Sequence, residues 1–124
     1  MSMVTYNANI KNTCGYPIRV LASDEFGAIE LNQVLNEGEA VNVLPYFICS
    51  GTRGIFTIEA FVSTINELER CLPKSYVLEI SADNNQITLD KTQFLSVLRR
   101  SESISSANFA VYDFEISDPS LCPK

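Results

Sequence analysis

The chain has 124 residues, of which 46% are hydrophobic and 19% charged, and its formal net charge is −6. These values are typical of one folded domain with a substantial buried core, so we expect a single domain over residues 1–124. An acidic chain lacks the basic face that nucleic acid requires, so we expect no nucleic acid partner. No apolar stretch approaches the roughly 18 residues that would span a bilayer, so we expect no transmembrane segment.

The first third of the chain predicts short strands separated by polar turns. Tyr6, Ala8 and Ile10 alternate with polar residues, a pattern typical of a half-buried strand. Residues 18–22 predict a second strand, and the turn between the two, over residues 12–17, predicts that they form a hairpin. Two more strands are expected over residues 28–35 and 40–44, after a polar turn over residues 23–27.

Residues 45–54, with the sequence PYFICSGTRG, form the least regular segment. Tyr46 and Phe47 offer apolar area and Arg53 offers a directional charge, and these residue types are enriched at binding hot spots. Because loops carry function on β scaffolds, we predict that Tyr46, Phe47 and Arg53 are binding residues. The alternative is structural, with both aromatic rings buried at the end of a strand.

The middle of the chain predicts a strand followed by a helix. Residues 55–61 alternate as a strand does, and the spacing of Thr64 and Glu67 resembles a capping box. We therefore expect a short helix over residues 65–70 that ends at Cys71, before the helix-breaking Pro73.

The last third mixes further strands with a second helix. Alternation over residues 76–80 and 86–89, around a turn at residues 83–85, predicts a hairpin. The spacing of Asp90 and Gln93 before an apolar run predicts a capped helix, for which a strand is the alternative. A serine-rich loop is expected over residues 101–106 and a last strand over residues 110–116. The many short strands favour an all-β fold, an antiparallel β-sandwich with one or two short helices.

The chain contains no histidine, which excludes Ser-His-Asp triads, Cys-His dyads and the zinc sites that use histidine. The cysteine spacings are too long for a four-cysteine zinc site. We therefore expect that the protein binds no metal and no cofactor, and that it is not an enzyme. A carboxylate-dependent hydrolase is the alternative, because Asp113 and Glu115 fall on one side of a strand, roughly 6–7 Å apart. A solvated strand face explains the same two residues.

The four cysteines suggest two bridges. Cys14 lies near the start and Cys122 near the end, with Cys49 and Cys71 between them, which suggests an outer bridge around an inner one. Four cysteines allow three connectivities, and the sequence alone does not choose among them. Paired cysteines favour an oxidising compartment and a secreted protein. A cytoplasmic protein is the alternative, because residues 1–9 do not resemble a signal peptide.

Residues 6–22, YNANIKNTCGYPIRVLA, resemble the opening strand pair of the thaumatin-like proteins. The likeness is carried by Asn12, Cys14 and Tyr16, followed by the alternating Ile18 and Val20. The resemblance implies a β-sandwich with tied termini, in which the first cysteine is bridged to one near the C-terminus. We therefore hypothesise that Cys14 pairs with Cys122, and Cys49 with Cys71.

Together these observations predict a non-enzymatic binding protein, a secreted defence or effector protein that contacts a cell surface or a protein partner. The alternatives are the hydrolase that uses Asp113 and Glu115, and a lipid-binding, membrane-perturbing protein. The sequence does not predict an oligomeric state.

Overall fold

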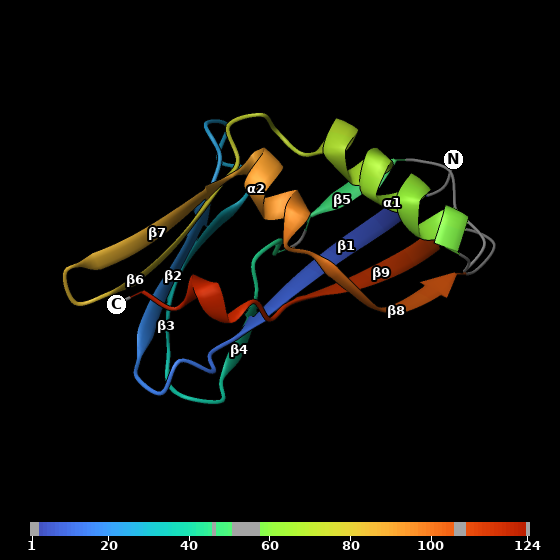
Figure 1. Cartoon of the computed structure of the whole chain (residues 1–124). Coiled ribbons are helices and arrows are strands. Elements are labelled where there is room, and N and C mark those ends of the chain that lie inside the picture. The colour runs from blue at the N-terminus through green and yellow to red at the C-terminus, as the bar shows by residue number, and fades with distance from the viewer. Residues whose placement is uncertain (1–2, 46, 51–57, 106–108, 124) are drawn as a thin grey trace.

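The computed structural model describes residues 3–45, 47–50, 58–105 and 109–123, which form two β-sheets and two α-helices (Figure 1). The strands are β1 (Met3–Lys11), β2 (Ile18–Ser23), β3 (Glu30–Leu35), β4 (Ala40–Asn42), β5 (Ile48–Ser50), β6 (Val77–Ala82), β7 (Asn85–Asp90), β8 (Arg99–Ser105) and β9 (Phe109–Ile116). The helices are α1 (Ile58–Cys71), α2 (Lys91–Ser96) and the 3₁₀ turn η1 (Pro119–Leu121). The predicted all-β, sandwich-like fold is confirmed, although only α2 of the two α-helices is short.

The five-stranded sheet is built around β1. Its strands lie in the order β4-β1-β9-β8, and β5 pairs with β1 near the start of that strand, whereas β4 pairs near its end. The β1–β9 pair is parallel, and the other pairs of the two sheets are antiparallel. The register places buried side chains opposite one another: Tyr6 with Tyr112, Ala8 with Phe114, and Ile10 with Ile116.

The four-stranded sheet has the order β3-β2-β6-β7 and is antiparallel throughout. Its buried residues also alternate, with Val20 opposite Ile80 and Ala22 opposite Leu78. Apolar side chains of both sheets and both helices form one core. Figure 1 shows the two sheets at an angle to each other, with α1 running beside β5 at the end of the five-stranded sheet.

The predicted hairpin between β1 and β2 is wrong, because these strands belong to different sheets. The turn between them is held by Asn12, which is fully buried. Its Nδ2 donates to the carbonyls of Tyr16 (2.8 Å) and Leu35 (2.9 Å), and its Oδ1 accepts from the Cys14 N–H (2.9 Å). The Asn12 N–H donates to the Glu39 carbonyl, so β1 ends beside the turn that leads into β4. Alternation predicts a strand but does not identify its partner.

The strand predicted over residues 55–61 is wrong from Ile58 onward, because α1 begins there, while residues 55–57 lie outside the described part of the chain. Thr64 is therefore inside the helix and does not cap it. The helix ends at Cys71, as predicted. Apolar residues at positions 58, 61, 65 and 68 follow the helical period. Residues 55–61 also alternate as a strand does, and a segment that short does not distinguish the two periods.

The serine-rich loop is also corrected, because residues 101–105 belong to β8, while Ser106 lies outside the described residues. β8 pairs with β9 with a register shift between Arg100 and Glu102, which leaves Ser101 without a partner in the ladder. Backbone pairing with a long neighbouring strand outweighs the weak strand preference of serine.

Two local predictions of the last third are confirmed. β6 and β7 form the expected hairpin around Asp83, whose φ of 53° places it in the left-handed region that tight turns use. α2 begins with a full capping box: the Asp90 carboxylate accepts from the Gln93 N–H (2.8 Å), and the Gln93 side chain accepts from the Asp90 N–H (3.0 Å). Phe94 of α2 is buried against Tyr76, with ring centroids 4.7 Å apart.

The disulfides are Cys14–Cys122 and Cys49–Cys71, as hypothesised. The first joins the turn after β1 to the residue that follows η1, and the second joins β5 to the end of α1. Two disulfides indicate an oxidising, extracellular environment. Among the described residues, no helix is long and apolar enough to cross a membrane.

Candidate functional site

The predicted binding segment contributes Phe47 to the core. This ring is only 8% exposed, so it lies inside the protein and not at a surface where a partner could touch it. The physical reason is strand alternation, because Phe47 and Cys49 point inward while Ile48 between them is 51% exposed. Tyr46 and Arg53, the other two predicted binding residues, lie outside the described residues.

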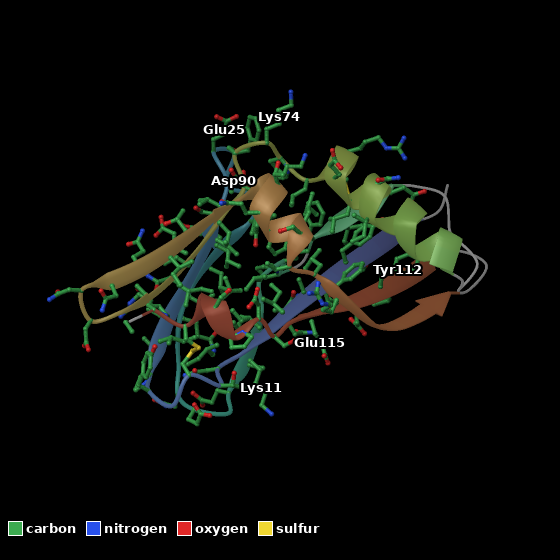
Figure 2. The ribbon with its side chains drawn as sticks, in the orientation of Figure 1. Lys11, Glu25, Lys74, Asp90, Tyr112 and Glu115 are labelled. Atoms are coloured by element: carbon green, nitrogen blue, oxygen red, sulfur yellow. A yellow bond between two sulfur atoms is a disulfide. The ribbon has the colours of Figure 1, made fainter. Side chains whose placement is uncertain are left out.

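The carboxylates of Asp113 and Glu115 lie on the outer face of β9. The Asp113 Oδ1 accepts a hydrogen bond from the Asn7 Nδ2 (2.9 Å), and the Asn42 Nδ2 donates to the Asn7 Oδ1 (3.1 Å). Glu115 is exposed and lies opposite Asn9 in the register of the sheet. Figure 2 shows Glu115 on the side of β9 opposite to Tyr112. The structure therefore places Asp113 in a hydrogen-bonded row across β4, β1 and β9.

Phe26 is the most exposed large apolar side chain among the described residues, at 75%. It follows β2 in the segment that the sequence predicts only as a polar turn. Val34, at 46%, and Ile48 are the other large apolar residues that this part of the structure exposes. A phenylalanine isolated within a polar turn is the sequence signal that could have identified this residue.

Asp24 fixes the backbone on both sides of Phe26. Its Oδ1 accepts from the Phe26 N–H (2.6 Å), which is the hydrogen bond of an Asx turn, and its Oδ2 accepts from the Ile29 N–H (2.7 Å). The Gly27 N–H donates to the Asp24 carbonyl, and Gly27 has a φ of +73°, which only glycine adopts readily. Ile29 is fully buried and anchors the far end of the turn.

A second contact ties this turn to the segment between α1 and β6. The Glu25 N–H donates to the Ser75 Oγ (2.9 Å), although the two residues are 50 positions apart in the chain. Lys74, which precedes Ser75, is exposed. Figure 2 shows Glu25, Lys74 and Asp90 at the same end of the molecule.

An open depression of about 320 Å³ lies beside this segment, between the end of α1 and the start of α2. It is lined by Glu69, Lys74, Asp90, Lys91, Thr92 and Leu95. Two of its charged groups are already engaged, since Asp90 caps α2 and the Lys91 Nζ donates to the Leu72 carbonyl (2.8 Å). The depression therefore carries charged groups of both signs.

Two other features lie in the interior of the protein. A cavity of about 20 Å³ beside the Cys14–Cys122 bridge has room for about one water molecule. The Tyr6 hydroxyl is buried and has no hydrogen-bond partner among the described residues. Burial, and next the negative charge of Glu67, raise the pKa of this hydroxyl above its ordinary value.

Comparison of the chain with protein-family models, with curated proteins and with solved structures found no match. The described residues contain no group of three or more acidic, cysteine or histidine side chains placed to hold a metal ion.

Proposed function

We propose that this chain is a secreted, non-enzymatic binding protein that contacts a protein or a cell-surface ligand. The observation that carries the proposal is the 75% exposure of Phe26 on a turn held by hydrogen bonds. Aromatic residues are enriched at protein interfaces, where they are frequent anchors. A rigid turn that displays such a ring is suited to recognition.

The disulfides support the proposal that the protein is secreted. Bridges of this kind persist outside the reducing cytosol, and here they hold both β5 and the end of the chain. The likeness to thaumatin-like proteins, from which the Cys14–Cys122 pairing was expected, is part of the same proposal. A role in defence, or as an effector, is part of the same proposal.

A binding array combined with a hydrolase screen tests the proposal. The disulfide-bonded protein is labelled and titrated onto purified extracellular protein domains and cell-surface glycans, and it is incubated separately with chromogenic hydrolase substrates. We expect saturable binding to a small number of array members and no turnover. Turnover that disappears in Asp113→Asn or Glu115→Gln would replace this proposal with a carboxylate-dependent hydrolase, and the absence of saturable binding would also count against it.

A further inference from the structure

We infer that Phe26, with Glu25 and Lys74 beside it, forms a docking surface for a protein whose own surface offers an apolar pocket bordered by charges of both signs. This inference rests on the proposed function and names the kind of partner. We refer below to these three residues as the Phe26 surface.

The turn that carries Phe26 is held rigidly by hydrogen bonds. The N–H groups of Glu25, Phe26 and Ile29 are all used in hydrogen bonds, to Ser75 and to the two carboxylate oxygens of Asp24. A contact residue on a fixed backbone loses little conformational entropy when it binds. The turn is therefore organised before any partner arrives.

The Phe26 ring is set apart from the buried aromatic side chains of the protein by its exposure. Six of the aromatic side chains in the described residues are buried: Tyr6, Phe47, Tyr76, Phe94, Tyr112 and Phe114. Phe26 instead stands on a turn, with its exposed fraction ninefold that of Phe47. A convex aromatic group of this kind gains most when it enters a concave apolar pocket, where its whole surface leaves water.

The charged groups near the turn are of both signs. Glu25 is the neighbour of Phe26 in the chain, and Lys74 is the neighbour of Ser75, whose Oγ accepts from the Glu25 N–H. Figure 2 shows Glu25 and Lys74 close to each other at this end of the molecule. Glu69, Asp90 and Lys91 line the adjacent depression together with Lys74, so charges of both signs lie there too. Nucleic acid and anionic lipid both present negative charge alone and would be repelled by the three carboxylates, Glu25, Glu69 and Asp90. A protein surface can match both signs, so the pattern favours a protein.

Selection of peptides against the protein tests this inference without a known partner. A random library of displayed cyclic peptides is enriched on the immobilised, disulfide-bonded protein. The enriched peptides are then titrated against the wild-type protein, Phe26→Ala, Lys74→Glu and the control Val34→Ala, which removes another exposed apolar side chain. Because Phe26 and Lys74 are exposed, the variants should fold, and circular dichroism and thermal melting verify that they do.

We expect most enriched peptides to bind Phe26→Ala at least about tenfold more weakly than the wild type, the size of a hot-spot truncation. Lys74→Glu should weaken them about threefold or more, and Val34→Ala should leave their affinity unchanged. Peptides that bind Phe26→Ala as tightly as the wild type would overturn the inference, and so would a library that enriches no binder.

Two further experiments distinguish this inference from a membrane contact and from binding at another surface of the protein. Sedimentation with vesicles of phosphatidylcholine and phosphatidylserine should leave the protein in solution, and Phe26-dependent sedimentation would show a membrane contact instead. Any binder from the array is titrated against the same variants. Saturable binding that is insensitive to Phe26→Ala and Lys74→Glu would contradict the Phe26 surface while leaving the proposed function intact.

Discussion

The hydroxyl of Tyr76 donates a hydrogen bond of 2.9 Å to the backbone carbonyl of Val43. Tyr76 directly precedes β6 of the four-stranded sheet, and Val43 directly follows β4 of the five-stranded sheet, so this bond joins the two sheets within the core. Both residues are buried, and water has no access to either group when the bond is removed.

Replacing Tyr76 by phenylalanine should lower the free energy of unfolding by about 1–3 kcal/mol, because the Val43 carbonyl is left buried without its donor. Urea denaturation measures the loss. Tyr16→Phe is the control: its hydroxyl donates to the Pro123 carbonyl from a half-buried position, so the cost should be smaller. Equal stability of Tyr76→Phe and the wild type would show that the bond between the sheets contributes little.

Stability should fall at alkaline pH. Burial raises the pKa values of Tyr6 and Tyr76 above the ordinary value of 10.0, because it penalises the phenolate. Above pH 10 the unfolded chain releases these protons while the folded chain keeps them, so the contribution of the two tyrosines to the free energy of unfolding is constant below pH 10 and decreases above it. Each tyrosine can contribute up to about 1.4 kcal/mol per pH unit.

The measurement is urea denaturation at intervals from neutral pH to above pH 10, with phenolate absorbance recorded in parallel. Tyr76→Phe should show a shallower decrease than the wild type, because one of the two buried hydroxyls is gone. Parallel curves for the two proteins would indicate that Tyr76 ionises equally in both states.

Asn12→Asp should destabilise the protein by roughly 3 kcal/mol or more. The substitution preserves the shape of the side chain but removes the Nδ2 that donates to Tyr16 and Leu35, and it places a carboxylate against their carbonyls. Asn32→Asp is the matched control, because Asn32 is exposed and its Oδ1 accepts from Arg19, which a carboxylate can do as well. The control should stay within about 0.5 kcal/mol of the wild type. A similar loss in both variants would point to an effect of net charge.

The outer disulfide should stabilise the chain more than the inner one. It closes a sequence separation of 108 residues, compared with 22 for Cys49–Cys71, and a longer loop loses more entropy in the unfolded chain. The chain-entropy model gives about 4.8 and about 3.4 kcal/mol for the two bridges. Denaturant unfolding of the double serine variant of each pair measures the difference. A greater loss from the inner pair would mean that its anchoring of α1 outweighs loop length.

The sequence predicts the elements whose signals are local. The capping box of α2 lies within four residues, and the turn at Asp83 lies between the two strands that it connects, so each determines its own structure. The partner of β1 is different in kind. Its longest pairing is with β9, more than 100 residues away, and no pattern within residues 3–11 specifies it.

The candidate site likewise combines features that the local sequence predicts with features that depend on the whole fold. The hypothesis about residues 45–54 depended on composition, and strand alternation then placed Phe47 in the core. Phe26 stands out in the sequence only as an apolar residue within a polar turn, and how far it is exposed depends on what the rest of the chain leaves uncovered. Asp24, two residues earlier, did carry a readable turn signal.

The parallel pairing of β1 with β9 also has a consequence for synthesis. β1 leaves the ribosome about 100 residues before its principal partner, so the five-stranded sheet cannot close until β9 has been made. During that interval an apolar strand edge stands open to other chains, and the four-stranded sheet, whose members are all made earlier, can form first. A chaperone that covers β1 until β9 has been made would therefore protect the chain from aggregation through this strand edge.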